Sequence, residues 1–137
     1  MIVDSSAIIA LVLEEPEVET VRANLRSASH VRAGAPTLLE TGIVLRSRLG
    51  PRGRTLHAVT LGRLELETLA FDGRHWPVAL DAFTRFGKRR HPAGLNFGDC
   101  FAYGLAKVTG EPLLFKGGDF GHTDVNSALA AGDGRGF

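Results

Sequence analysis

The chain has 137 residues, of which 44% are hydrophobic, and this length and composition suit a single domain with one sizeable core. Its one cysteine, Cys100, excludes an intramolecular disulfide and favours a reducing compartment, so we expect a cytoplasmic protein. The longest apolar run, Ala7 to Leu13, is too short to cross a bilayer, and the residues after Met1 lack the basic start of an export signal. We therefore expect neither export nor a membrane anchor.

The charged residues nearly balance, with 16 Lys and Arg against 15 Asp and Glu and a net charge of +1. Setting aside the four acids considered below leaves 11 acids against 16 bases, a charge of +5 on the rest of the chain. An acidic pocket on a basic body suits a polyanionic substrate, although solvated helix faces would carry the same charges. Two basic clusters are candidates for phosphate contacts: Arg85, Lys88, Arg89, Arg90 and His91, and Arg46, Arg48, Arg52 and Arg54.

The first half of the chain alternates predicted strands and helices. Ile2-Val3 predicts a short strand that ends at Asp4, and Ser5-Ser6 then begins a helix. Pro16 begins a second helix with an acidic first turn, and residues 31–35 predict a second strand. A third helix runs from residue 36 to a Gly-Pro stop at residues 50–51. The residues that share its apolar face are Leu38, Leu39, Gly42, Ile43 and Leu45.

The second half continues the alternation. Residues 55–63 and 77–86 predict helices, and the segment between them, 66–71, predicts a strand. A basic loop over 87–92 leads to a helix from Asn96 to Val108, which Gly110 ends. The last predicted strand is Leu113-Leu114-Phe115, and we expect the Gly-rich tail from 132 to 137 to be disordered.

This alternation predicts an α/β fold in which a short parallel central sheet is flanked by helices on both faces. No linker or repeat divides the chain, so we expect one domain over residues 1–137. Parallel sheets bind their ligands at the carboxyl ends of the strands. Asp4 follows the first strand and Asp119 lies a few residues past the last, so the two ends of the sequence can converge on one crevice.

Four acids stand at positions where such a crevice would form, and each has a structural alternative. Asp4 could be a helix N-cap, Asp99 could belong to a capping box with Asn96, and Asp119 could be an ordinary turn residue. Glu40 is harder to explain structurally, because it lies near the edge of an apolar helix face where partial burial is expected. A half-buried carboxylate needs a partner.

The order of these residues resembles the signature of the PIN-domain family, and the closest resemblance is to VapC ribonuclease toxins. The resemblance covers nearly the whole chain. The segments that carry it are Ile2-Val3-Asp4-Ser5-Ser6-Ala7, Leu39-Glu40-Thr41, Leu95-Asn96-Phe97-Gly98-Asp99-Cys100 and Leu114-Phe115-Lys116-Gly117-Gly118-Asp119-Phe120. One departure is Gly118, which stands where many relatives carry an acid or an amide before the last acid.

The resemblance implies a PIN-like three-layer fold and a Mg²⁺-dependent endoribonuclease, with Mn²⁺ as an alternative ion. It implies an RNA substrate, inhibition by a VapB-like antitoxin, and a homodimer or a toxin–antitoxin hetero-oligomer. It assigns the catalytic cluster to Asp4, Glu40, Asp99 and Asp119, with Ser6 and Asn96 as supporting residues. Asp4 and Asp99 are the expected metal ligands, and the candidates for RNA contacts are Lys88, Arg89, Arg90 and Lys116.

An all-carboxylate cluster has a clear chemical use. Carboxylates within about 4 Å repel one another by about 4 kcal/mol per pair at an effective dielectric near 20, and a divalent cation removes this conflict. Oxygen ligands favour Mg²⁺ or Mn²⁺ over zinc, and the five histidines lack ligand spacing, so we interpret them as structural or surface residues. Water activated at Mg²⁺ would cleave a phosphodiester to a 5′-phosphate and a 3′-hydroxyl.

Three alternatives remain from the sequence. A phospho-receiver domain shares the fold and an acidic Mg²⁺ pocket, but it would need adjacent acids after the first strand, where Ser5-Ser6 stands. A haloacid-dehalogenase-type phosphatase would need an Asp in place of Ser6. A degenerate PIN domain would bind RNA or protein without cleaving it, and Gly118 is the main argument for it.

Overall fold

The computed structural model describes residues 1–129, so the tail that we expect to be disordered lies outside the described residues. In the described part, a central sheet of four parallel strands has the order β3-β2-β1-β4. The strands are short, which is why the sequence shows only brief apolar runs. Their bounds are β1 (Ile2–Val3), β2 (Arg32–Gly34), β3 (Glu67–Leu69) and β4 (Leu113–Leu114).

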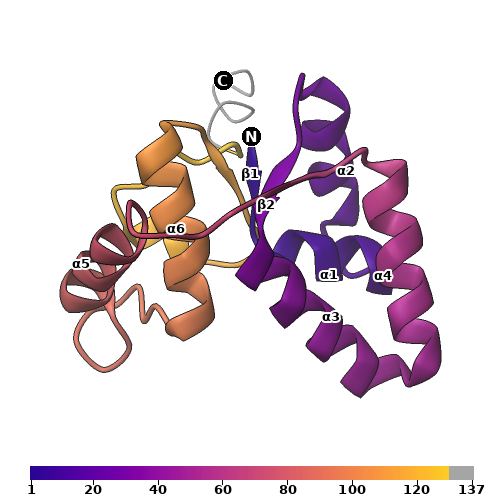
Figure 1. The fold of residues 1–137 in the computed structure, drawn as a ribbon, viewed down its shortest axis with the longest axis horizontal. Helices are drawn as coiled ribbons and strands as arrows, with labels where there is room; N and C mark the ends of the chain where they lie inside the picture. Colours follow the sequence, from indigo (N-terminus) through magenta and orange to yellow (C-terminus); the bar gives the residue numbers. More distant parts are fainter. Residues whose placement is uncertain (130–137) are drawn as a thin grey trace.

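Helices cover both faces of this sheet, which confirms the predicted α/β architecture (Figure 1). The helices α5 and α6 pack on one face, and α1, α2 and α4 pack on the other. Between these groups, α3 contacts both α1 and α6. The helix bounds are α1 (Ser5–Leu13), α2 (Val18–Ser27), α3 (Ala35–Leu49), α4 (Pro51–Arg63), α5 (Trp76–Phe86) and α6 (Phe97–Thr109), followed by the short 3₁₀ helix η1 (Phe120–His122).

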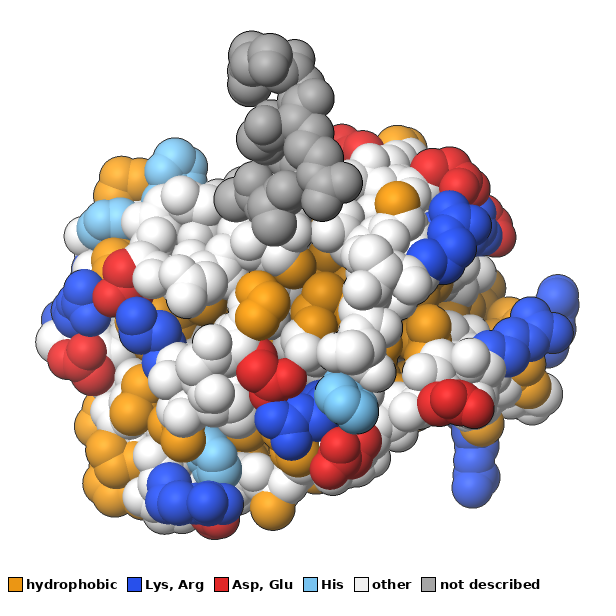
Figure 2. Space-filling view, turned by 90° about the horizontal axis from the view of Figure 1, so that it is seen from above, with side chains coloured by type: hydrophobic (Ala, Val, Ile, Leu, Met, Phe, Trp, Pro, Cys, Tyr) orange, Lys and Arg blue, Asp and Glu red, His pale blue; other side chains and the backbone are white. Residues whose placement is uncertain are grey.

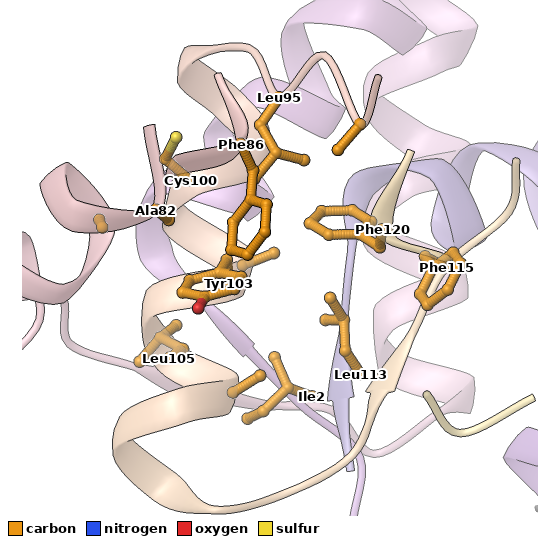
Figure 3. Packing of buried hydrophobic residues seen from close by; sticks show 14 residues of the cluster. Ile2, Ala82, Phe86, Leu95, Cys100, Tyr103, Leu105, Leu113, Phe115 and Phe120 are labelled. Atoms are coloured by element: carbon orange, nitrogen blue, oxygen red, sulfur yellow. The ribbon is translucent and has the colours of Figure 1, made fainter. Parts of the chain in front are cut away.

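The two central strands divide their side chains between two hydrophobic clusters. Ile2 and Leu113 point to the face covered by α5 and α6, whereas Val3 and Leu114 point to the opposite face. This follows from the strand geometry, in which successive side chains alternate between the faces of the sheet. Figure 3 shows the first cluster, in which side chains of the strands meet those of α5, α6 and the segment after β4.

Two details of the helices differ from the sequence prediction. The fourth helix begins at Pro51 and not near residue 55, because proline fits the first turn of a helix. The apolar face predicted for α3 is only partly its core face: Leu45 is buried and Leu38 packs against the second cluster, but Leu39 is 66% exposed and Ile43 is 57% exposed. The buried side of α3 also carries Thr37 and Thr41, which the prediction did not include.

The structure places the two edges of the sheet in different surroundings. The strands begin on the side of the molecule where the amino terminus lies (Figure 1), and on this face acidic and basic side chains are mixed (Figure 2). The carboxyl ends of the strands, where the sequence predicts the site, lie on the opposite side. None of the described helices is long and apolar enough to cross a membrane.

A close approach between α3 and α4 gives a test of this packing. A Cβ atom added at Gly53 would lie 2.2 Å from the Leu45 carbonyl oxygen, so we expect Gly53→Ala to destabilise the protein by about 1–3 kcal/mol. At Gly62, in the same helix, a Cβ atom has open space, and Gly62→Ala should stabilise the protein by up to about 1 kcal/mol. Urea denaturation of both variants measures the difference, and equal effects would contradict the packing.

Candidate active site

Asp4 leaves the central strand and enters the interior of the protein. Its side chain is 2% exposed, and its backbone N–H donates to the Leu114 carbonyl (2.9 Å), which ties it to β4. The Oδ2 atom accepts hydrogen bonds from the backbone N–H (3.0 Å) and the hydroxyl (2.7 Å) of Ser6, and thereby caps α1. The Oδ1 atom is buried and has no hydrogen-bond partner among residues 1–129. Asp4 therefore caps a helix with one carboxylate oxygen and leaves the other oxygen available for a ligand.

Asp99 lies in the first turn of α6 and forms the predicted capping box. Its Oδ2 accepts from the Asn96 backbone N–H, and the Asn96 side chain accepts from the Asp99 backbone N–H, each at 2.9 Å. These reciprocal bonds fix the orientation of the carboxylate at the amino-terminal end of the helix, where negative charge is favoured. The capping interpretation and the site interpretation are compatible, as they are for Asp4.

Glu40 reaches the same place from α3. The first turn of α6 has a glycine beneath this carboxylate, since a Cβ atom added at Gly98 would lie 2.0 Å from Glu40 Oε2. Only a residue without a side chain allows this approach. Glu40 is half-buried, as predicted, although Leu39 beside it is exposed. The role of Gly98 was not predicted from the sequence, although a glycine between the two members of a capping box was a signal for it.

Asp119 follows β4 in an exposed turn just before η1. The turn is joined to the Asp4 region through Ser6, whose hydroxyl accepts from the Lys116 backbone N–H at 2.9 Å. Gly117 has a φ of +100°, a conformation that glycine adopts without strain. The predicted supporting residues Ser6 and Asn96 thus each hold a site carboxylate, and Ser6 also joins the two ends of the sequence.

Repulsion between the acids shows that they share one electrostatic environment. The pKa of Asp99 is raised to about 6, mainly by burial and also by the charges of Asp4, Asp119 and Glu40, while the hydrogen bond from the Asn96 backbone opposes the shift. The pKa of Asp4 is likewise raised to about 6, mainly by burial and also by the charge of Glu40, while the Ser6 hydrogen bonds oppose the shift. Asp99 thus lies within electrostatic reach of each of the other three predicted acids, and Asp4 lies within reach of Glu40.

These residues fit a divalent cation in their chemistry. The cluster supplies only oxygen ligands, and the buried, unpartnered Asp4 Oδ1 lies where desolvation makes a negative charge costly. Within residues 1–129, no three Asp, Glu, His or Cys side chains are already arranged as ligands around one point. Mg²⁺ usually binds through one or two carboxylates and keeps several waters, so it does not need three protein ligands around one point.

The basic candidates fall into two groups. Lys88, Arg89 and Arg90 are exposed and form no ion pair with any residue in the described part of the chain. Their loop is attached near Asn96, because the Lys88 backbone N–H donates to the Leu95 carbonyl (2.9 Å). By contrast, Lys116 pairs with Glu15 at 3.4 Å and Arg85 pairs with Asp81 and Asp124.

The histidines support the structural interpretation where the structure shows their contacts. His75 is buried, and its Nδ1 accepts from the Asp72 backbone N–H at 2.9 Å. His91 Nδ1 accepts from the Ala93 backbone N–H at 3.0 Å. Cys100 is a free, buried thiol.

A short parallel sheet with acids at its carboxyl edge is the architecture of a PIN domain, and the PIN domain model matches residues 1–126. Ribonuclease VapC30 of Mycobacterium tuberculosis is 44% identical over 127 residues, which cover 91% of this chain and 95% of that protein. Ribonuclease VapC of Mycolicibacterium smegmatis is also 44% identical, over 91% of this chain and 97% of its own length. The chain therefore belongs to the PIN domain family and, within it, to the VapC ribonuclease toxins of toxin–antitoxin systems.

Solved structures with low sequence identity share the fold. The crystal structure of Mycobacterium tuberculosis VapC20, a toxin that cleaves the sarcin–ricin loop, superposes with a TM-score of 0.74 at 19% identity, covering 90% of this chain and 95% of that chain. VapBC2 of Rickettsia felis, bound to a DNA fragment from its promoter, gives a TM-score of 0.71 at 10% identity, covering 92% and 94%. Membership of the PIN domain family, shown by the matching domain model and the 44% identical relatives, excludes the receiver-domain and phosphatase alternatives.

The raised pKa of Asp4 predicts how stability changes with pH without a divalent cation. Because the pKa is about 6 in the folded protein and 3.8 in the unfolded chain, the favourable contribution is complete below pH 3.8 and is lost as pH rises through 6. The loss amounts to about 3 kcal/mol for a full shift. We expect Asp4→Asn to be more stable than the wild type at pH 7 in EDTA.

Urea denaturation at pH 4 and pH 7 tests this expectation. The advantage of Asp4→Asn should shrink toward pH 4, where the wild-type carboxyl is largely protonated. An equal difference between the two proteins at both pH values would show that Asp4 is not strained by its burial.

Proposed function

We propose that residues 1–137 form a single PIN domain that acts as a cytoplasmic Mg²⁺-dependent endoribonuclease, with Mn²⁺ able to replace Mg²⁺. Asp4 and Asp99 bind the principal ion, and Glu40 and Asp119 orient the attacking water or hold a second ion. The observation that carries the proposal is the buried Asp4 carboxylate, one oxygen of which has no hydrogen-bond partner among residues 1–129, beside Asp99, on which the charges of Asp4, Glu40 and Asp119 all act.

The residues of the chain have distinct tasks in this reaction. A bound ion supplies an activated water and neutralises the charge that develops on the phosphodiester. Ser6 holds one oxygen of Asp4, and Asn96 holds one oxygen of Asp99, so both carboxylates are oriented before substrate binds. Attack by water gives a 5′-phosphate and a 3′-hydroxyl. No protein base is required for this step.

The loop that carries Lys88, Arg89 and Arg90 is the proposed contact for the RNA backbone. All three side chains are exposed, and the loop is attached beside the amino-terminal end of α6, which carries Asp99. Phosphates bound here would lie close to the acidic cluster. Lys116 is a weaker candidate, because its ammonium group already pairs with Glu15.

The proposed partners are a VapB-like antitoxin, whose carboxyl-terminal segment occupies the acidic crevice, and a second copy of the chain. The second copy has a candidate surface, which we call the apolar strip: Leu39, Ile43, Trp76, Leu80, Phe83 and Phe97. Phe97, 78% exposed, lines both the hollow beside Leu39 and Ile43 and the hollow beside Trp76, Leu80 and Phe83, so the strip is continuous.

The size of the apolar strip favours a dimer. A large apolar side chain has about 150–250 Å² of surface. Multiplied by the exposed fractions of the six residues, this gives roughly 600 Å² of exposed apolar surface per copy. A monomer rarely leaves this much contiguous apolar area in water, whereas a stable interface buries about 800 Å² per partner, including a polar rim. The six side chains are uncharged, and Glu40 is the one charged residue in the described part of the chain that lines either hollow, so two copies related by a twofold axis can cover each other's apolar side chains.

The nuclease proposal is tested by RNA cleavage with the purified protein. We expect cleavage of total RNA in Mg²⁺, none in EDTA, and a loss of at least about 100-fold for Asp99→Asn, because removal of a ligand weakens both ion binding and charge neutralisation. Circular dichroism checks that the variant is folded. Products with 2′,3′-cyclic phosphates, or cleavage that survives EDTA, would contradict the mechanism. Absence of cleavage by the wild type under all conditions would favour a non-catalytic PIN domain.

The dimer proposal is tested by charged substitutions on the apolar strip. Ile43→Glu and Leu80→Glu each place a charge in the proposed interface, and we expect both to convert a dimer into a monomer in sedimentation experiments. Val59→Glu is the matched control, since Val59 is 43% exposed on α4 outside the strip. A wild-type protein that sediments as a monomer would remove the proposal.

A further inference from the structure

Asp119 depends on its neighbours for its position. It follows two exposed glycines, Gly117 and Gly118, and its side chain makes no capping hydrogen bond to η1 within the described residues. A side chain on such a turn is placed by whatever anchors the chain on each side. The anchor before the turn is the hydrogen bond from the Lys116 backbone to Ser6.

The first anchor after the turn is Phe120. Its ring is buried and lies 5.2 Å, centroid to centroid, from that of Phe115. Figure 3 shows the ring pointing into the same cluster as Phe86 and Tyr103. This contact buries the residue directly after Asp119, and backbone hydrogen bonds from Leu113 to Asn126 and from Ala128 to Leu113 hold the segment further on.

The second anchor is Asp124, which receives donors from two helices. Its Oδ1 accepts from the Tyr103 hydroxyl at 2.6 Å, and its Oδ2 lies 3.3 Å from both Lys107 Nζ and Arg85 Nη2. Tyr103 is 1% exposed, so its hydroxyl needs a partner at the end of an otherwise buried ring. Hydrogen bonds to a carboxylate are stronger than those between neutral groups.

The spacing on α6 connects this anchor to the acidic cluster. Asp99, Tyr103 and Lys107 follow one another at intervals of four residues, so they form one stripe along the helix. Asp124, in the segment that also carries Asp119, is hydrogen-bonded to Tyr103 and Lys107 in the carboxyl-terminal part of this stripe. The charge of Asp119 acts on Asp99, at the amino-terminal end of the stripe. The rigid helix α6 therefore sets the distance between Asp99 and the segment that carries Asp119.

We infer that Asp124 is a positioning residue that fixes the separation between Asp119 and Asp99, and thereby sets the affinity of the acidic cluster for a divalent cation. The inference rests on the proposed function, because it treats the cluster as a cation site. Residues that orient metal ligands through hydrogen bonds change metal affinity by about 10–100-fold when they are replaced.

The first test is Mn²⁺ binding, measured by the electron paramagnetic resonance signal of the free ion. We expect Asp124→Asn and Tyr103→Phe each to weaken Mn²⁺ binding by about 10-fold. The matched control is Asp81→Asn, which removes the other carboxylate that pairs with Arg85 and leaves the Asp124 contacts with Tyr103 and Lys107 in place. Unchanged binding in both Asp124→Asn and Tyr103→Phe would overturn the inference. If Asp124→Asn does not fold, the Mn²⁺ affinity of Tyr103→Phe alone tests the inference, and an unchanged affinity overturns it.

A double substitution separates positioning from a general loss of stability. If Asp124 acts through Asp119, then Asp124→Asn should weaken Mn²⁺ binding by less than about twofold in a protein that already carries Asp119→Asn, since coupled sites are not additive. An equal 10-fold loss in both backgrounds would show that Asp124 acts elsewhere and would overturn the inference.

The same titration distinguishes this inference from the proposed function. If Asp99→Asn abolishes Mn²⁺ binding while Asp124→Asn and Tyr103→Phe leave it unchanged, only the positioning role is wrong. If Asp99→Asn leaves Mn²⁺ binding unchanged, the cation site itself is wrong, and the role of Asp124 falls with it.

Discussion

Desolvation of the Asp4 carboxylate is the constraint around which the other parts of the site are arranged. The charge lies at the end of the central strand, and water does not reach it. One oxygen is satisfied by capping α1, and the hydroxyl that helps to satisfy it is in turn bonded to the segment after β4. The other oxygen has no hydrogen-bond partner among residues 1–129, and three further acids raise the cost of ionising Asp99. Either protonation of a carboxyl group or a bound cation relieves such a cluster, and the proposed function assigns this role to a divalent cation.

The structural roles of the acids and their proposed chemical roles support each other. A carboxylate that caps a helix is held in one rotamer, and the helix dipole partly offsets its charge. Asp4 and Asp99 are both held in this way, from α1 and from α6. Glu40 and Asp119 lack such bonds in the described residues, and they reach the cluster by close approach over Gly98 and through a glycine-containing turn. The side chains of Asp4 and Asp99 are therefore more restricted in conformation than those of Glu40 and Asp119.

The sequence was sufficient for the parts of the structure that depend on local patterns. The strands at Ile2-Val3 and Leu113-Leu114, the parallel sheet and the capping box at Asn96 and Asp99 all follow from periodicity, capping residues and helix stops. The face of α3 could not be predicted in this way, because periodicity marks an apolar stripe without saying which partner covers it. Leu39 and Ile43 look like core residues in the sequence and are exposed in the structure. The Asp124 contacts were equally invisible, since they join residues 21 and 39 positions apart.

The pairing of β1 with β4 has a consequence for the synthesis of the chain. Ile2 pairs with Leu113 and Val3 with Leu114, so β1, which can pair with β2 early, meets its second neighbour β4 only after more than a hundred residues have been added. Until then Asp4 lacks the backbone partner on Leu114, and the segment that carries Asp119 does not yet exist. The acidic cluster therefore cannot assemble on a ribosome-bound fragment that ends before β4, and closing this long loop is an entropic cost that falls late in folding. The order of the strands thus confines the assembled site to chains that extend past β4 and the turn that carries Asp119.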